Sequence, residues 1–285
     1  MSALRSEGEP RGGAWLAPWS LALAAVVLSF DYAFKRFCSQ ASATELDFLL
    51  GPTTALVRLV TGYAFVAESG AGYVSRDAHV IIAPACSGAN FAIVAFTSLA
   101  LGFGYRFASR LTSLAWLVVA GTTAYALTLV TNAARISLGL AFERSHALSA
   151  WFSAGAVHRG VGVAMYLGAL VAIYLTAERV LGRRAVNVRF PLACYVAVTL
   201  ATPLLGGAYH CPEFISHAMV VLGATTLAGV VLWGLHRADD KAVTRTLAGD
   251  DRDAHVPGRV DALERGRERS LPGQGDAALV PRPLA

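Results

Sequence analysis

The stretch that decides the fold runs from residue 83 to residue 105 and reads APACSGANFAIVAFTSLALGFGY. Its second part, Phe91–Tyr105, is almost entirely apolar, and a helix of about 20 such residues crosses the hydrocarbon core of a bilayer. Its first part places Cys86 at the start of that helix, where unpaired first-turn N–H groups and the helix dipole favour the reactive thiolate. Because cysteine is also a small packing residue in apolar helices, the rest of the chain has to decide between the two interpretations.

The composition of the chain is that of a membrane protein. Of its 285 residues 55% are hydrophobic and 15% are charged, and the mean hydropathy is +0.52. A soluble domain carries about 25% charged residues. The net charge of +5 comes largely from arginines in short loops between apolar runs, not from a basic face with aromatic residues. We therefore expect the lipid bilayer as a partner and no nucleic acid.

Apolar runs along the chain predict an all-α polytopic membrane protein with about six transmembrane helices. No clean small-residue cleavage site follows the first run, so it is interpreted as a retained span and not as a cleaved signal peptide. A loose polar tail, residues 1–14, precedes a transmembrane domain of residues 15–235. The predicted spans are Trp15–Phe34, Cys86–Tyr105, Leu111–Thr131, Gly160–Thr176, Phe190–Tyr209 and Phe214–Leu235.

A further apolar run, Phe48–Val66, predicts a helix that lies in the membrane interface. Gly51-Pro52 interrupts this run early, and Arg58 stands near its middle. From Pro52 onward, apolar and polar residues occupy opposite helical faces, as in an interfacial helix, although a seventh span at this place remains open. The predicted apolar face holds Ala55, Leu56, Leu59, Val60 and Tyr63, and the polar face holds Thr53, Thr54, Arg58 and Thr61.

Between this helix and Cys86, the sequence predicts a small β-hairpin outside the membrane. Its strands are Gly70–Val74 and His79–Ile82, on either side of the turn-like Ser75-Arg76-Asp77. Residues 236–285 are polar, mixed in charge and rich in glycine and proline, which is typical of a disordered tail.

The basic residues gather in loops 106–110 and 179–189 and at the start of the tail, so these segments are expected in the cytoplasm. It follows that Cys86, Arg135 and His158 all lie at the opposite, extracytoplasmic face. Asn132, one helical turn before Arg135, shares its face and could orient it.

These three side chains are the parts of a nucleophilic site. Arg135 is costly in so apolar a setting and needs a partner or a wet cavity; it either reaches to the interface or stabilises a thiolate or an oxyanion. His158 titrates near neutrality and suits a general base, although it could instead face headgroups, and His146 competes for the role. A thiol, a guanidinium and an imidazole at one face indicate a cysteine transpeptidase.

The remaining cysteines and histidines predict no metal or cofactor. Cys38, Cys194 and Cys211 are ordinary membrane-protein cysteines, and for Cys38 and Cys211 both free thiols and a disulfide remain open. The spacing from His210 to His217 fits no common ligand pattern for zinc.

Three motifs resemble the exosortase and archaeosortase family. They are Ala85-Cys86-Ser87-Gly88, Asn132-Ala133-Ala134-Arg135-Ile136, and His158 followed by a glycine-rich span. The similar region runs from about Thr44 to Leu181, roughly half of the chain, and the short form of the chain is similar to the exosortase K branch. Two features depart from the family pattern: Ala89-Asn90-Phe91 replaces an aliphatic residue after Ser-Gly, and fewer spans precede the cysteine.

The resemblance implies a multi-pass enzyme of the plasma (inner) membrane that processes proteins bearing a C-terminal sorting signal. Such a signal comprises a short motif, one transmembrane helix and a basic cluster. Carried over, Cys86 is the nucleophile, Arg135 the oxyanion or thiolate stabiliser and His158 the proton shuttle, with Ser87, Gly88 and Asn132 in support. The acceptor that resolves the thioester stays open. The main alternative is a membrane transporter with Arg135 and Asn132 lining its pathway.

Overall fold

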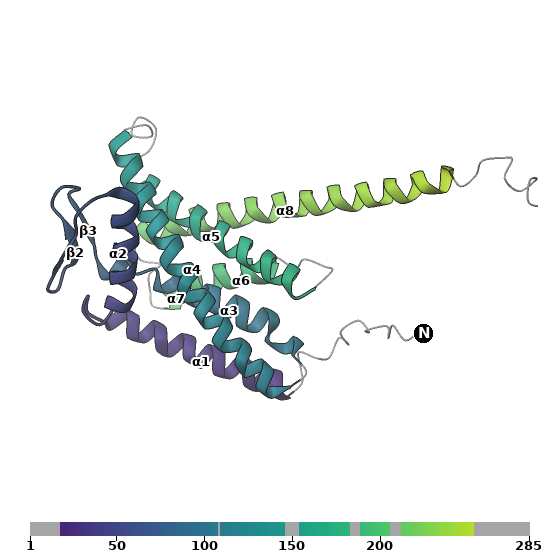
Figure 1. The fold of residues 1–285 in the computed structure, drawn as a ribbon, viewed down its shortest axis with the longest axis horizontal. Helices are drawn as coiled ribbons and strands as arrows, with labels where there is room; N and C mark the ends of the chain where they lie inside the picture. The colour runs from purple at the N-terminus through teal and green to yellow at the C-terminus, as the bar shows by residue number, and fades with distance from the viewer. Residues whose placement is uncertain (1–17, 108, 146–153, 183–188, 206–211, 254–285) are drawn as a thin grey trace, which may run out of the picture. The chain divides into compact units, whose positions relative to one another are not determined.

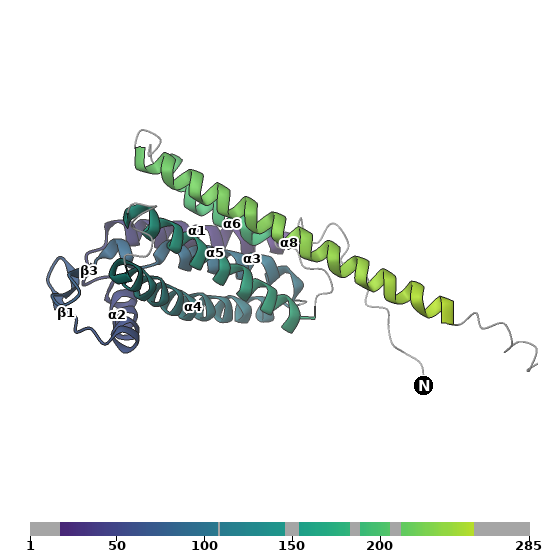
Figure 2. The ribbon, with the colours of Figure 1, turned by 90° about the horizontal axis from the view of Figure 1, so that it is seen from above.

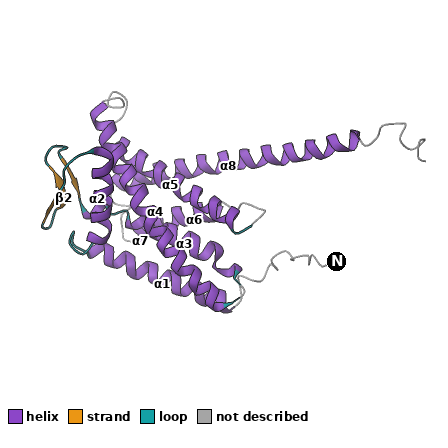
Figure 3. Ribbon diagram, in the orientation of Figure 1, coloured by secondary structure: helices purple, strands orange, loops and turns teal. Residues whose placement is uncertain are grey.

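The computed structural model describes the chain apart from residues 1–17, 108, 146–153, 183–188, 206–211 and 254–285. The described residues are mostly helical and include one small antiparallel sheet, as the sequence predicts (Figure 3). The chain divides into two units, Met1–Leu232 and Trp233–Ala285. The first unit holds the sheet and all the predicted site residues.

One helix, α3, forms the centre of the first unit. It packs against four other helices, which run beside it in both views of the ribbon (Figures 1 and 2). Its span is 72% buried, whereas that of α4 is 22% buried, so α3 is enclosed by protein while α4 has a wide outer surface. The helices are α1 (Pro18–Gln40), α3 (Ala89–Phe103), α4 (Arg110–Ser145), α5 (Ala154–Val180) and α6 (Arg189–Val196).

Four helices of the described chain are long and apolar enough to cross a bilayer, which supports the predicted membrane protein. They coincide with the second, third, fourth and sixth predicted spans. The first predicted span forms α1, whose C-terminal half carries Asp31, Lys35 and Arg36, and α1 is not one of the four. The four are Pro84–Phe103, Arg110–Phe142, Arg159–Val180 and Phe214–Gly234.

The fifth predicted span is shorter and less regular than expected. After α6 comes a π-helical turn, Ala197–Ala201, and then the single turn α7, Thr202–Leu205. Pro203 lacks the N–H that a continuous α-helix would use to bond the carbonyl of residue 199, and proline of this kind disrupts regular α-helical geometry. The rest of this predicted span, residues 206–209, lies outside the described residues.

Helix α2 (Asp47–Thr61) lies across the ends of the other helices instead of beside them (Figures 1 and 2). Pro52 stands inside it and does not interrupt it, contrary to the prediction. Pro52 has no N–H to donate to the carbonyl of Phe48, but the hydroxyl of Tyr125 on α4 donates to that oxygen at 2.7 Å. A hydrogen bond from a neighbouring helix therefore replaces the one that proline removes.

Burial along α2 follows the two predicted faces only in part, since Leu49, Leu50 and Val57 are buried and Arg58 is exposed. Thr53 and Thr54, on the predicted polar face, are buried as well. Leu59 and Val60, on the predicted apolar face, are 81% and 70% exposed. Such a helix presents apolar side chains away from the protein, as the predicted interfacial helix would.

The predicted hairpin is present, and a third strand extends it. Strands β2 (Gly72–Ser75) and β3 (Val80–Ile82) pair antiparallel with Tyr73 opposite Ile82, and β1 (Val66–Glu68) pairs with the other edge of β2. The prediction placed Val66 at the end of a helix, but α2 ends at Thr61 because Gly62 adopts a left-handed φ of 76° and caps it. The freed residues add a strand to the sheet.

Helix α8 (Pro212–Asp253) is longer than predicted. The sequence predicts a span ending at Leu235 and disorder from His236, whereas residues 236–253 continue the helix. The remainder of the predicted disordered tail, residues 254–285, lies outside the described part of the chain.

The described residues Arg110 and Arg179, which belong to the basic loops, lie at one end of the helices, and the predicted site lies toward the other (Figure 1). The guanidinium carbon of Arg110, at the start of α4, is 5.3 Å from the ring centre of Trp19, at the start of α1. The sheet, α2 and the residues leading into α3 lie at the opposite end (Figure 1). Cys86 and Arg135 are therefore separated from the basic loops by nearly the length of α3.

Candidate active site

Cys86 lies in a tight turn just before α3. It closes a 3-10 turn, Pro84–Cys86, in which its N–H donates to the carbonyl of Ala83 at 2.7 Å. Gly88 then adopts φ 75° and caps α3, which begins at Ala89. The sequence predicts Cys86 at the first residue of the helix. In the structure Cys86 lies in the 3-10 turn that precedes α3, three residues before the helix begins.

Gly88 also lets this turn approach α4 closely. A Cβ at this position would lie 3.0 Å from Cγ2 of Thr128 and 3.3 Å from Cγ of Asn132, both closer than ordinary van der Waals contact. Positive φ and close approach are two independent reasons for glycine at one position. The neighbouring Ser87 is buried, and its hydroxyl accepts a hydrogen bond from the N–H of Ala89 at 3.4 Å.

Asn132 joins three parts of the site. Its side chain is fully buried, and its Nδ2 donates to the carbonyl of Cys86 at 2.6 Å. Its Oδ1 accepts from Nε of Arg135 at 3.3 Å and from the hydroxyl of Tyr166 on α5 at 2.9 Å. One buried amide therefore fixes the cysteine turn, the arginine and α5 relative to one another.

Arg135 is held between α4 and α5. Its guanidinium carbon is 5.5 Å from the ring centre of Tyr166, within the range of a cation–π interaction. Gly162 leaves room for the side chain, since a Cβ there would lie 3.3 Å from Cδ of Arg135. Tyr166 in turn stacks on Phe91 of α3, with ring centres 4.7 Å apart and an interplanar angle of 15°.

The third predicted catalytic residue is only partly described. His158 belongs to α5, directly before Arg159 and one turn before Gly162, but its side chain lies outside what the structure describes. His146, the competing candidate, lies outside the described residues altogether. The structure brings Cys86 and Arg135 together through Asn132, and the role of His158 stays a prediction.

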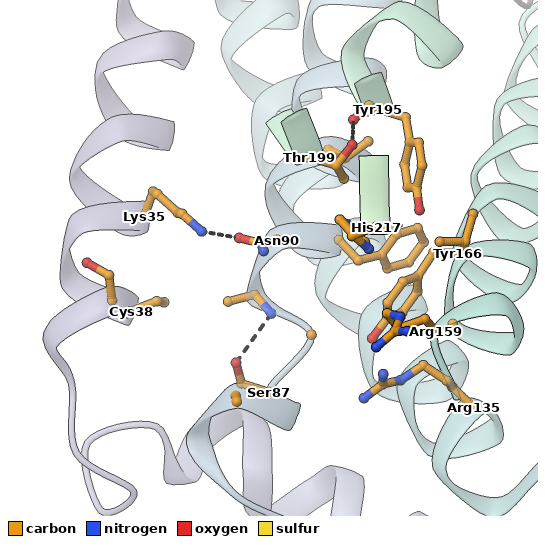
Figure 4. A pocket seen from close by; sticks show the side chains of 18 of the residues that line it. Lys35, Cys38, Ser87, Asn90, Arg135, Arg159, Tyr166, Tyr195, Thr199 and His217 are labelled. Atoms are coloured by element: carbon orange, nitrogen blue, oxygen red, sulfur yellow. Dashed lines mark hydrogen bonds between the residues drawn. The ribbon is translucent and has the colours of Figure 1, made fainter. Parts of the chain in front are cut away.

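A cavity of about 310 Å³ opens beside these residues (Figure 4). Ala85, Ser87 and Gly88 line one side of it, and Arg135 lines another. The Cys86 side chain is half-buried and packs on the apolar cluster between α2, β3 and α4. The neighbours of Cys86 in the turn line the cavity, whereas Cys86 itself packs on this cluster and is not one of the lining residues.

Several lining residues were not predicted as part of the site. Tyr166 and Arg159 are on α5, which is apolar nearly all round, so its sequence does not indicate which face is functional. Lys35 and Cys38 come from the end of α1, and their distance in sequence from Cys86 hides the contact. His217 was considered only as a metal ligand. Tyr195 and Thr199 are further examples.

The described cysteines are free thiols. They are Cys38, Cys86 and Cys194, while Cys211 lies outside the described residues, so its predicted alternatives are untested. Among the described residues, His, Cys, Asp and Glu side chains form no group of three that could hold a metal ion. The histidine and cysteine at positions 210 and 211 lie outside the described residues.

Comparison with protein-family models, curated proteins and solved structures returned no match.

Proposed function

We propose that the chain is a membrane-embedded cysteine transpeptidase similar to the exosortases and archaeosortases. It would cleave the C-terminal sorting signal of exported proteins through a thioester and pass them to an acceptor. The observation that carries this proposal is the Asn132 side chain, which bonds the Cys86 carbonyl at 2.6 Å and Arg135 at 3.3 Å beside a cavity. Residues from two of the three motifs thus meet at one site.

In the proposed reaction, the Cys86 thiolate attacks the carbonyl carbon of the scissile peptide bond. The carbonyl oxygen becomes an oxyanion, which the Arg135 guanidinium stabilises. The C–N bond then breaks, the sorting-signal amine leaves with a proton from His158, and the exported protein remains on Cys86 as a thioester. An amine of the acceptor, or water, attacks the thioester and restores the thiol.

The thiol has to reach the substrate for this reaction. Sγ of Cys86 packs on the apolar cluster, while Ser87 and Gly88 line the cavity. We propose that rotation about χ1 brings the sulfur to the cavity while Asn132 keeps its bond to the Cys86 carbonyl. We expect substrate binding to favour that rotamer.

The proposed enzyme would lie in the plasma (inner) membrane with about six spans, including α1 and the segment that begins at α6. The basic loops 106–110 and 179–189 would be cytoplasmic, and the cavity would then open at the extracytoplasmic face. A sorting-signal helix would lie beside the enzyme's spans and present its motif there.

The alternative is a transporter in which Asn132 and Arg135 line a pathway. Asn132 is fully buried and its amide already has three partners in the protein. A passing solute would have to break bonds that hold the cysteine turn in place, which favours a positioning role for Asn132 over a pathway role.

The test is processing of a reporter protein with a C-terminal sorting signal, produced in cells together with the chain. Cys86→Ala and Arg135→Ala should abolish the shortening of the reporter. Cys194→Ala is the matched control, because Cys194 is also a half-buried thiol but packs in a different cluster. Unchanged processing by Cys86→Ala would refute the proposal.

A second test traps the nucleophile on the purified protein. A peptide with a sorting motif and a thiol-reactive group should form an adduct on Cys86, and less of it in Arg135→Ala. Cys38 is the stringent internal control because it is a thiol that lines the cavity beside Cys86. Equal labelling of Cys38 and Cys86 would mean that Cys86 has no special reactivity, and the transporter alternative would then be preferred.

A further inference from the structure

The cavity beside Cys86 has a one-sided charge. Lys35, Arg135 and Arg159 line it, and none of the described lining residues is an aspartate or a glutamate. The three cations come from three different helices, α1, α4 and α5, with Lys35 on one side of the cavity and Arg135 and Arg159 on the other (Figure 4). Within an apolar bundle, gathered cations without carboxylates are costly unless an anion joins them.

Two of these cations, Arg159 and Lys35, have N–H groups that donate no hydrogen bond to a described residue. Nε of Arg159 is buried and has no hydrogen-bond partner among the described residues. Lys35 donates to the side-chain carbonyl of Asn90, which uses one of its three N–H groups. Neither Lys35 nor Arg159 forms an ion pair with a described carboxylate.

Another part of the cavity wall is apolar and aromatic, which further restricts the kind of ligand that fits. Phe91, Val94 and Val163 line the cavity together with the rings of Tyr166 and Tyr195. His217, from α8, adds an imidazole near Arg159, which acts on it electrostatically (Figure 4). A charged head with an apolar body beside it matches both walls.

We infer that this cavity binds the phosphate group of a lipid, with Lys35 and Arg159 as its cationic ligands. A single carboxylate is satisfied by one bidentate guanidinium, whereas a phosphate monoester carries a charge of about −1.5 to −2 and three acceptor oxygens. Three cations and an imidazole fit the second kind of anion. A volume of about 310 Å³ holds such a headgroup and leaves the chains to the apolar wall and the bilayer.

This inference shares the cavity and Arg135 with the transpeptidase proposal, but it concerns binding alone and does not require the thiol. Cys86→Ala should bind the lipid as the wild type does. Loss of reporter processing and loss of lipid binding are thus separate observations.

The test is a titration of the purified full chain, in a neutral detergent, with dioleoyl phosphatidic acid, followed by native mass spectrometry. Dioleoylglycerol, which has the same chains and no phosphate, is the matched probe. We expect a clear preference for phosphatidic acid, and a Kd raised about tenfold or more in Arg159→Gln and in Lys35→Gln. Glutamine at position 35 retains a donor for Asn90.

Arg58→Gln is the control for nonspecific attraction. Arg58 is an exposed arginine on α2, outside the cavity, and its loss changes the net charge by the same amount. Binding that is unaffected in both cavity variants, or weakened equally in Arg58→Gln, would overturn the inference. Because the two cavity variants are on different helices, one still tests it if the other fails to fold, as judged by its melting temperature.

A competition arm identifies the source of the phosphate. Inorganic phosphate at millimolar concentration should displace phosphatidic acid poorly, because it makes no contact with the apolar wall. Complete displacement, with direct phosphate binding that Arg159→Gln abolishes, would overturn the lipid assignment in favour of a soluble phosphate.

Discussion

Asn132 shows at the scale of one residue why a polar side chain is retained within an apolar helix. An unsatisfied amide there would cost about 1–3 kcal/mol, but each polar atom of Asn132 has a partner, on the cysteine turn, on α4 or on α5. Its three bonds tie segments that are far apart in sequence. Geometry at Cys86 therefore depends on a residue that does no chemistry itself.

Gly88→Ala tests the close contact on which this geometry depends. Gly70→Ala is the control, because Gly70 also has a positive φ, of 81°, but nothing lies within 4 Å of its Cβ position. Both variants incur the backbone cost of a left-handed alanine, about 1–2 kcal/mol. Only Gly88→Ala also crowds Asn132, at 3.3 Å, which we expect to add about 1–3 kcal/mol.

The measurements are thermal unfolding in detergent and the rate of Cys86 alkylation. We expect Gly88→Ala to be the less stable variant and to alter the alkylation rate, whereas Gly70→Ala leaves that rate unchanged. Equal destabilisation by the two substitutions would show that the approach of Gly88 to Asn132 has no energetic weight.

Some residues of the site can be predicted from the sequence and others cannot, for a physical reason. Cys86, Asn132 and Arg135 are unusual residue types next to apolar spans, so composition alone draws attention to them. Tyr166 and Lys35 are ordinary at a membrane interface, and only packing brings them to the cavity. The contribution of His158 is still a prediction.

At the scale of an element, α2 shows how a helix accommodates an internal proline. The hydroxyl of Tyr125 bonds the Phe48 carbonyl that Pro52 leaves without a helical partner. We expect Tyr125→Phe to destabilise the protein by about 1 kcal/mol or slightly more, because neither lipid nor detergent chains can replace the donor. Thermal unfolding in detergent measures this change.

A double-mutant cycle makes the test specific. Pro52→Ala restores an N–H that can bond Phe48, so Tyr125→Phe should cost almost nothing in that background. Tyr32→Phe, at a 68% exposed position on α1, controls for the loss of a hydroxyl as such. If Tyr125→Phe costs the same in the wild-type chain and in the Pro52→Ala variant, the hydroxyl does not replace the missing helical bond.

The hydrophobic pattern predicts that a helix exists better than it predicts the residues at which the helix ends. Apolar length located the four membrane-type helices within a few residues, but α4 continues past the predicted end at Thr131 to Ser145. Hydropathy reports where apolar sequence stops, and a helix continues as long as its backbone bonds do. Strand β1 was missed because it follows directly on a helix, with only Gly62 to mark the change.

At the scale of the first unit, the fold class followed from composition, and the arrangement of helices did not. Nothing in the apolar runs distinguishes the central α3 from α4, although 72% of one span and 22% of the other are buried. Helices in a bilayer are apolar whether they face lipid or protein, so hydropathy carries little information on which is enclosed. Polar contacts show which helices pack together. Asp31 of α1, for example, accepts a hydrogen bond from Thr97 of α3 at 2.6 Å.

The last prediction concerns the two ends of the helices in the membrane. Asp77, in the turn between β2 and β3, and Arg179, near the end of α5, are both exposed and stand at opposite ends. With Cys38, Cys86, Cys194 and Cys211 replaced by alanine, a single cysteine is introduced at position 77 or 179. An impermeant thiol reagent should label Asp77→Cys in intact cells, and Arg179→Cys only after permeabilisation, because basic loops stay in the cytoplasm.

Labelling of both in intact cells would place the two ends on one side and rule out a spanning bundle. The reverse pattern would put the cavity in the cytoplasm, where exported substrates do not arrive.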